Sequence, residues 1–148
     1  MIQFQRVLHP TDFSKASGPA FTKAVRLAKQ NHAELILVHV LPPVLPPGYA
    51  DWRKTYWRIG AQERRFAQSR LSALLARARR AKVRGKVLIL SGVTYDEIVR
   101  AARSERADLI VMGSHGWTGL KRLLMGSVAE RVVGFSPCPV LIVRGRKG

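Results

Sequence analysis

The sequence has a single cysteine and lacks any long apolar run. Cys138, which stands between Pro137 and Pro139, cannot form an internal disulfide and has no second cysteine with which to share a structural zinc ion. We expect it to serve as a packing residue. A bilayer-spanning helix needs about 20 consecutive apolar residues, and no stretch of the chain reaches that length. The first ten residues, MIQFQRVLHP, lack the apolar stretch of a signal peptide. We therefore expect a cytoplasmic protein with no membrane span.

Acidic residues are also scarce. The chain has 26 Lys and Arg against 9 Asp and Glu, which gives a formal charge of +17 and a sequence pI near 11.5. Such an excess attracts ATP, nucleic acid and acidic membranes alike, so the charge alone does not identify the partner. With 148 residues, of which 47% are hydrophobic, the chain is long enough for one domain with a full core. We expect a single domain over residues 1–148.

Short apolar runs alternate with segments that have helical periodicity. The runs predict strands at 4–8, 33–41, 86–90, 109–112 and 140–143, and the periodic segments predict helices after residue 14, at 61–82, from residue 94, and at 128–135. This alternation favours an α/β fold with an open parallel sheet and helices on both faces.

One segment departs from this alternation, because residues 42–60 carry four prolines and are predicted to form a loop. Its aromatic residues, Tyr49, Trp52, Tyr56 and Trp57, could cover the sheet edge, cap a bound base or seal a dimer contact.

A glycine-rich segment follows the fourth predicted strand. Gly113, Gly116 and Gly126 separate that strand from a helix, and Ser127 precedes Glu130 at the spacing of a capping box. Glycines let a ligand approach the backbone N–H groups closely, and a helix N-terminus adds its positive dipole end. The segment therefore predicts an anion site, with phosphate as its natural ligand. Ordinary turn glycines and a serine helix cap remain the alternative.

The spacing of these glycines is similar to a known family signature. The residues GSHG at 113–116, nine further residues, and then Gly126-Ser127 resemble the G-x2-G-x9-G-[S/T] motif in the ATP-binding branch of the universal stress protein family. The segments HPTDFS at 9–14 and SPCPVLIVR at 136–144 resemble the family's first and last strands, so the resemblance covers essentially the whole chain. The segment is neither a Walker A loop nor a Rossmann fingerprint.

The resemblance implies a five-stranded sheet of order 3-2-1-4-5 and a bound ATP, with Mg or Mn as the accompanying metal. In that order the chain reverses direction between the first and fourth strands, where open α/β sheets bind their ligands. Base and sugar would lie near Thr11, Asp12 and Val40, with Asp12 also a candidate metal ligand, and phosphates would rest on the glycine segment. The implied binding residues are Pro10, Thr11, Asp12, Val40, Met112, Gly113, His115, Gly116, Gly126, Ser127 and Val128.

The function that the resemblance implies is a nucleotide-dependent sensor or switch in the stress response, as a homodimer paired through the last strand. We find no nucleophile beside a base, so we expect at most slow ATP hydrolysis or autophosphorylation. A rival hypothesis is a polyanion-binding module for nucleic acid or acidic lipid, because the predicted helix at 61–82 is almost purely basic on its polar side. A third is an ATP-free dimeric scaffold.

Overall fold

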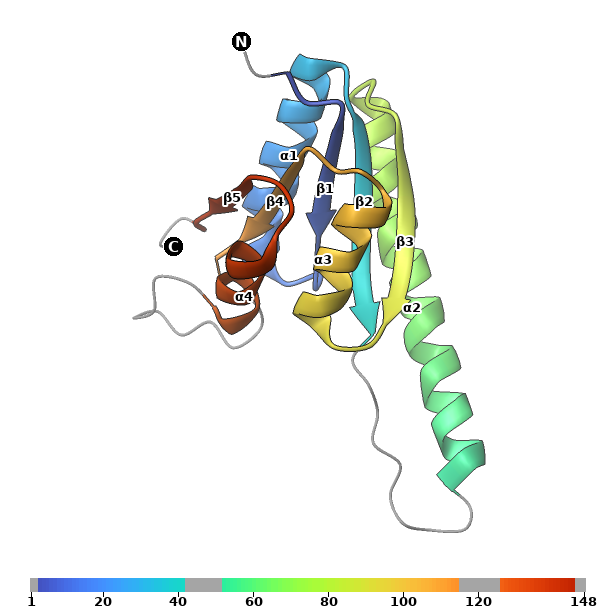
Figure 1. Cartoon of the computed structure of the whole chain (residues 1–148). Coiled ribbons are helices and arrows are strands. Elements are labelled where there is room, and N and C mark those ends of the chain that lie inside the picture. The colour runs from blue at the N-terminus through green and yellow to red at the C-terminus, as the bar shows by residue number, and fades with distance from the viewer. Residues whose placement is uncertain (1–2, 42–51, 115–125, 146–148) are drawn as a thin grey trace.

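The computed structural model describes residues 3–41, 52–114 and 126–145. A five-stranded sheet with parallel pairings lies at its centre, in the order β3-β2-β1-β4-β5 (Figure 1). Its strands are β1 (Arg6–Pro10), β2 (Glu34–Leu41), β3 (Gly85–Ser91), β4 (Leu109–Gly113) and β5 (Val140–Val143). The predicted fold class and strand order are confirmed.

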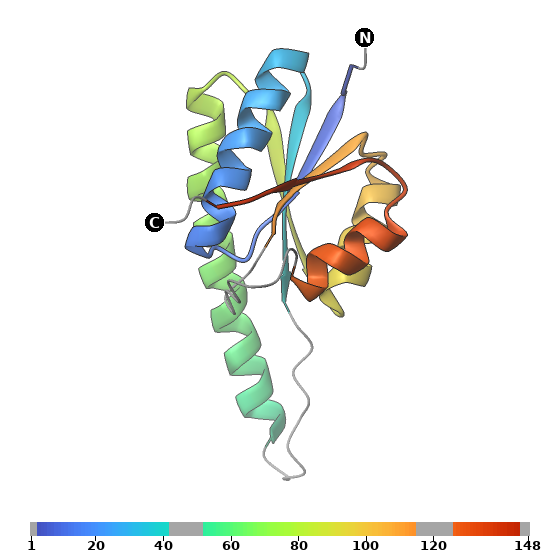
Figure 2. The same ribbon diagram turned by 90° about the vertical axis from the view of Figure 1, so that its left-hand side faces the viewer.

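Helices cover both faces of this sheet. On one face lie α1 (Gly18–Asn31), which follows a 3-10 turn at Lys15–Ser17, and α2 (Trp52–Arg80). On the other lie α3 (Thr94–Ser104) and α4 (Ser127–Phe135). Figure 2, which views the sheet nearly edge-on, shows the three layers, with α2 extending well beyond the sheet. Among the described residues no helix is both long enough and apolar enough to span a membrane.

The core has two halves because consecutive side chains of a strand point to opposite faces. Val7 of β1 packs with the α1 and α2 layer, and its neighbour Leu8 packs with the α3 and α4 layer. The central strands β1, β2 and β4 are buried over most of their length. Burial on both faces explains why these strands appear in the sequence as continuous apolar runs.

The prediction for residues 42–60 is wrong in its second half. Helix α2 begins at Trp52, because the last proline of the segment is Pro47 and residues 52–60 contain none to interrupt a helix. Residues 42–51 lie outside the described part of the chain. The roles considered for Tyr49, Trp52, Tyr56 and Trp57 concern side chains that the structure does not describe.

Candidate functional site: a cavity at the strand ends

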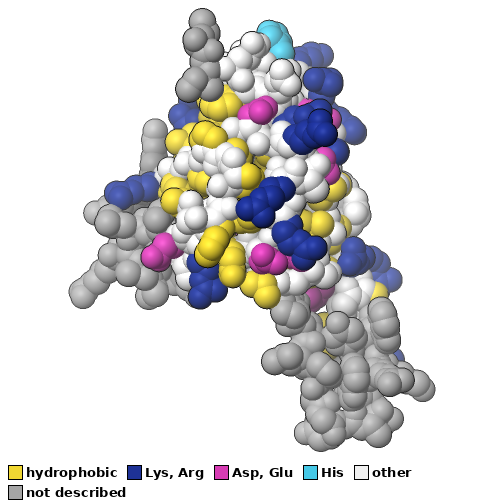
Figure 3. Space-filling model, viewed as in Figure 1, with side chains coloured by type: hydrophobic (Ala, Val, Ile, Leu, Met, Phe, Trp, Pro, Cys, Tyr) yellow, Lys and Arg dark blue, Asp and Glu magenta, His cyan; other side chains and the backbone are white. Residues whose placement is uncertain are grey.

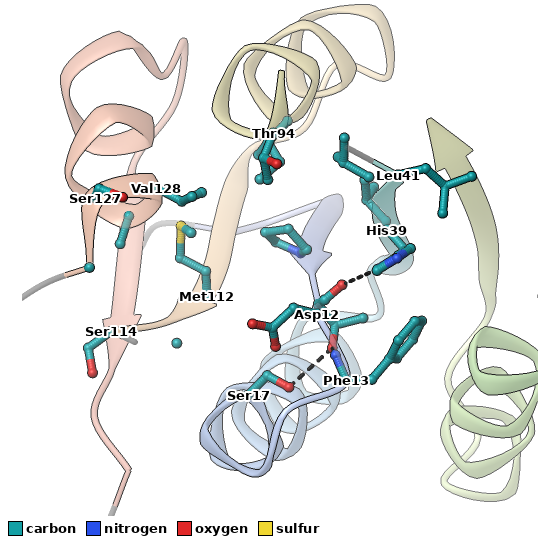
Figure 4. Close-up of a pocket in the computed structure, with 18 of the residues that line it drawn as sticks. Asp12, Phe13, Ser17, His39, Leu41, Thr94, Met112, Ser114, Ser127 and Val128 are labelled. Carbon is teal, nitrogen blue, oxygen red and sulfur yellow. Dashed lines mark hydrogen bonds between the residues drawn. The ribbon is translucent and has the colours of Figure 1, made fainter. Parts of the chain in front are cut away.

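A cavity of about 810 Å³ opens at the carboxyl ends of the central strands. In the sheet β1 lies between β2 and β4, so the chain reverses its direction of strand addition between β1 and β4. The cavity lies at this switch point of the sheet. Besides the strand ends, α2, α3 and α4 contribute to its walls. Figure 4 shows the side chains that the strand ends, α3 and α4 contribute to the cavity. Its volume lies within the range of small-molecule sites, roughly 300–1,000 Å³.

The loop after β1 is held by short hydrogen bonds. The Thr11 N–H donates to the Val38 carbonyl at 2.8 Å, which extends the β1–β2 pairing by one residue. The Phe13 N–H donates to Thr11 Oγ1 at 3.0 Å, and the Ser14 N–H donates to Asp12 Oδ1 at 2.9 Å. These bonds fix the Asp12 carboxylate at the cavity, on the side that faces β4 (Figure 4).

Phe13 has a backbone conformation that non-glycine residues rarely adopt, with φ of 65°. Its ring stacks on His39 at 4.5 Å between centroids, and the His39 Nδ1–H donates to the Thr11 carbonyl at 2.8 Å. The Phe66 ring lies nearly perpendicular to the Phe13 ring, with 6.2 Å between their centroids. The Arg70 guanidinium lies over both phenyl rings. The unusual φ therefore places Phe13 in an aromatic wall that lines one side of the cavity.

The opposite side of the cavity is the N-terminus of α4. The Ser114 N–H donates to the Val143 carbonyl at 3.2 Å, and the Gly126 N–H donates to the Ser114 carbonyl at 2.5 Å. Gly126 is the N-cap, with φ of −70° and ψ of 162°, and no side chain among the described residues caps the helix. The predicted capping role of Ser127 is wrong, because Ser127 is already the first helical residue and only an extended residue before the helix can cap it.

This uncapped helix end creates a positive region in the cavity wall. The first N–H groups of a helix have no intrahelical acceptor and carry the positive end of its dipole. Residues 126–129 all line the cavity. No Lys or Arg is among the described residues that line it, whereas Asp12 and Glu63 are. Backbone N–H groups are therefore the anion-binding element of the described wall.

A metal site built from protein groups alone is not present in the described residues, which contain no cluster of three or more His, Cys, Asp or Glu side chains that could hold an ion. Asp12 supplies one carboxylate to the cavity. A single carboxylate suits Mg²⁺ that arrives with phosphates, because Mg²⁺ is commonly held by one or two carboxylates together with substrate phosphates and water.

His9 is a buried polar residue of β1 near this site. Its Nδ1–H donates to the Val111 carbonyl at 2.8 Å, and its ring centroid lies 5.9 Å from that of Phe21. Its Nε2 has no hydrogen-bond partner among the described residues. Burial lowers the pKa of His9 to about 4, although the hydrogen bond to Val111 and the charge of Asp12 act in the opposite direction. His9 is therefore neutral at physiological pH.

The structure brings together most of the residues implied by the resemblance. Nine of them line the cavity: Pro10, Thr11, Asp12, Val40, Met112, Gly113, Gly126, Ser127 and Val128. His115 and Gly116 lie outside the described residues. The binding roles of all eleven stay predictions.

Sequence reasoning missed a second group of lining residues, which includes Phe13, Ser17, His39, Gln62, Phe66, Thr94 and Ile98. The sequence signal for Phe13 was its position directly after Asp12, and for Ser17 its place within the same short segment before α1. The residues from α2 and α3 gave no signal in sequence, because their place at the cavity depends on how far each helix extends past the strand ends.

A doubly wound parallel sheet with a cavity at its switch point defines the class of α/β proteins that bind ligands beyond the carboxyl ends of their strands. The model of the universal stress protein family matches residues 3–144. The chain belongs to the universal stress protein family, as the glycine spacing predicted.

Relatives by sequence include two proteins of Methanocaldococcus jannaschii. The chain is 37% identical over 147 residues to universal stress protein MJ0531, a match that covers 97% of this chain and 84% of the relative. It is 30% identical over 156 residues to universal stress protein MJ0577, a match that covers 97% of this chain and 96% of the relative.

Solved structures show the same architecture. The structure of MJ0577 matches with a TM-score of 0.88 and 28% identity, covering 99% of this chain and 100% of that one. Universal stress protein UspA from Lactobacillus plantarum matches with a TM-score of 0.87 and 25% identity, covering 97% of this chain and 100% of UspA. A universal stress protein in complex with cAMP matches with a TM-score of 0.67 and 27% identity, covering 98% of this chain and 100% of that protein. Nucleotide binding is therefore present among the solved relatives of this chain.

Proposed function

We propose that this protein binds ATP in the cavity at the strand ends and acts as a nucleotide-dependent sensor or switch in the stress response. The observation that carries the proposal is the N-terminus of α4, which no described side chain caps and which lines the same cavity as Asp12. An anion-binding helix end and a carboxylate in the wall of one cavity suit a ligand with phosphates and a hydroxylated sugar.

The cavity has room and chemistry for each part of a nucleotide. Phosphates would accept hydrogen bonds from the first N–H groups of α4, with the Ser127 hydroxyl beside them. The sugar would lie near Thr11 and Asp12, whose carboxylate can accept hydrogen bonds from hydroxyl groups. The base would lie against the backbone near Val40, where the surrounding wall is mostly apolar. Apolar walls with a few well-placed polar groups are typical of small-molecule sites.

The metal would come with the nucleotide. Asp12 would hold Mg²⁺ or Mn²⁺ together with phosphate oxygens, and the ion would offset the repulsion between those phosphates and the two carboxylates of the wall. This role for Asp12 is compatible with its hydrogen bond from the Ser14 N–H, because a carboxylate has about four lone-pair positions to share.

The relatives support nucleotide binding in general, because one solved family member holds cAMP. The choice of ATP rests on the spacing of Gly113, Gly116, Gly126 and Ser127, which resembles the signature of the ATP-binding branch. A triphosphate also has more negative charge than cAMP to interact with the positive end of α4.

The experiment is to measure the adenine nucleotide content of the purified protein and then to titrate the nucleotide-free protein calorimetrically with ATP, cAMP and adenosine, with and without Mg²⁺. We expect ATP with Mg²⁺ to bind at least tenfold more tightly than adenosine, because phosphates add the helix interaction. Equal affinities for ATP and adenosine would contradict the phosphate role of α4. Tighter binding of cAMP than of ATP would keep the cavity as a nucleotide site and reject ATP as its ligand.

A further inference from the structure

The outer layer formed by α1 and α2 carries nearly all of the excess positive charge that the structure describes. We call its twelve basic side chains, within residues 15–31 and 58–82, the basic face. They are Lys15, Lys23, Arg26, Lys29, Arg58, Arg64, Arg65, Arg70, Arg77, Arg79, Arg80 and Lys82. Eleven are exposed and Lys23 is half-buried. The same two segments contain one acidic residue, Glu63, which lines the cavity.

The opposite layer is electrically balanced. Helices α3 and α4, with the two residues that follow α3, contain four acidic and four basic residues: Asp96, Glu97, Glu105, Glu130, Arg100, Arg103, Arg106 and Arg131. Figure 3 shows this side of the molecule, where acidic, basic and apolar side chains interleave. The excess positive charge of the described side chains therefore lies on one face and is not spread evenly over them.

The charges of the basic face are not neutralised within the described part of the chain. The ion pairs found there are Lys86 with Glu105 and Arg100 with Glu97, and neither involves the basic face. Arg70 and Arg77 instead lie over aromatic rings, and Arg77 is 4.9 Å from the centroid of Phe21. An uncompensated cluster of this kind costs stability through self-repulsion, which a bound polyanion would relieve.

The size and chemistry of the face fit a nucleic acid duplex. From Arg58 to Arg80 the helix rises about 33 Å, close to the roughly 34 Å of one duplex turn. Eight of the twelve cations are arginines, whose planar guanidinium groups bind phosphate in a bidentate manner. The face therefore presents phosphate-binding groups over a whole turn of a duplex backbone.

The same face fits a lipid surface poorly. Peripheral binding to an acidic membrane combines basic groups with large apolar side chains that enter the headgroup region. Among the described residues of α1 and α2, the exposed large apolar side chains are Ile59 and Phe66, and Phe66 lines the cavity. Over residues 18–31 and 58–80, whose side chains the structure describes, the outer surface of this layer therefore has little that could insert into a bilayer.

We infer that the basic face binds the phosphate backbone of double-stranded nucleic acid without base-sequence preference, at a surface separate from the cavity. The contacts are electrostatic, so the affinity falls as salt rises, with a slope of log K against log salt of about −0.9 for each phosphate contacted. This activity goes beyond the proposed nucleotide binding and does not depend on it.

The test compares two triple variants with the same loss of charge on opposite faces. The first variant replaces three arginines of the basic face with Gln, at Arg65, Arg79 and Arg80. The second variant, the matched control, replaces three arginines of the opposite layer with Gln, at Arg100, Arg103 and Arg106. Fluorescence anisotropy with a labelled 20-base-pair duplex, at several salt concentrations from 50 to 200 mM, gives affinity and salt slope. We expect the first variant to bind at least tenfold more weakly at 150 mM salt, with its slope reduced by roughly two to three, and the control to stay within about threefold of wild type.

Four outcomes would overturn the inference. The first is that the wild-type protein does not bind the duplex at 150 mM salt. The second is that both variants lose the same duplex affinity, which would mean that net charge attracts the duplex without a particular docking face. Displacement of the duplex by saturating ATP and Mg²⁺ would place its phosphates in the cavity. Tighter binding to vesicles containing phosphatidylserine than to the duplex would assign the basic face to lipid.

Discussion

His9 makes the stability of the protein dependent on pH, because its environment opposes protonation. Its pKa is about 4 in the folded protein and near the ordinary histidine value of 6.5 in the unfolded chain. Above pH 6.5 the ring is neutral in both states. As the pH falls from 6.5 to 4, the unfolded chain takes up a proton that the folded protein does not, so unfolding becomes more favourable. The loss in free energy of unfolding attributable to His9 amounts to about 3 kcal/mol.

A comparison of His9→Gln with wild type isolates this effect. Urea unfolding at pH 7 and pH 4 should show that the variant loses about 3 kcal/mol less than wild type over this interval. His32→Asn is the control, because His32 is exposed at the end of α1, and this variant should keep the acid dependence of wild type. The same acid loss in His9→Gln and wild type would show that His9 is not the responsible group.

Phe66 is a second residue whose surroundings suggest a role. It is 60% exposed, yet it lines the cavity and meets the ring of Phe13 edge-on. Phe66→Ala should lower ATP affinity about fivefold, because an aromatic contact contributes about 1 kcal/mol. Stability should change little, since the side chain is mostly exposed. Phe135→Ala is the matched control, because Phe135 is also 60% exposed but lies at the end of α4, away from the cavity. Equal effects of both substitutions on calorimetric affinity would remove Phe66 from the site.

The N-terminus of α4 is the element on which the phosphate hypothesis depends. Gly126 has an extended N-cap conformation that aspartate adopts readily. In Gly126→Asp the new carboxylate would accept the N–H bonds proposed for phosphate and would repel it. We expect the variant to lose ATP affinity at least a hundredfold, equivalent to about 2.7 kcal/mol, while its thermal stability is unchanged or slightly higher through capping.

Val93→Asp provides the control for this substitution. Val93 is the N-cap of α3, is also extended, and likewise has no side-chain cap. The variant adds the same charge at an equivalent helix position outside the residues that line the cavity, so its ATP affinity should stay within a few-fold of wild type. A folded Gly126→Asp protein with undiminished affinity would refute the assignment of phosphate to α4.

The edge strand β5 is the element we propose for homodimer formation. It has β4 on one side and is the last strand of the sheet, where unpaired backbone groups can accept a partner strand. Val133 and Phe135 of α4 and Leu141 of β5 are exposed apolar residues from adjacent elements. Leu141→Lys should shift the protein from dimer to monomer in light scattering at micromolar concentration. Ile59→Lys, at a similarly exposed position on α2, should not. A monomeric wild type would reject the proposal.

At the scale of the whole molecule, most of the architecture could be predicted from the sequence. Central strands buried on both faces appear as apolar runs, so β2 and β4 were predicted close to their observed bounds. The strand order was predicted from the family resemblance, because apolar periodicity indicates which residues of a strand face the core but not which strands lie side by side. The start of α2 at Trp52 was missed because the prolines nearby dominated the interpretation of residues 42–60.

The candidate site could be predicted only in part, for a related reason. The loop residues that follow β1 and β4 are marked by a motif, so Asp12, Gly113 and Gly126 were found. Phe66 has no motif, and its role depends on where α2 passes the ends of the strands. The asymmetry of charge was likewise visible along the predicted helix at 61–82. The structure was needed to show that α1 shares this basic face and that α3 and α4 lie on the opposite, balanced face.

The nucleotide-binding proposal depends above all on ATP phosphates binding at the N-terminus of α4. An amide-resolved NMR titration of the isotopically labelled protein with ATP and Mg²⁺, at 150 mM salt, tests it most directly. We predict that the largest chemical-shift changes fall on the amides of Ser127, Val128 and Ala129 and on those of Thr11 and Asp12. Changes confined to the amides of α1 and α2, with those of residues 127–129 unmoved, would contradict it.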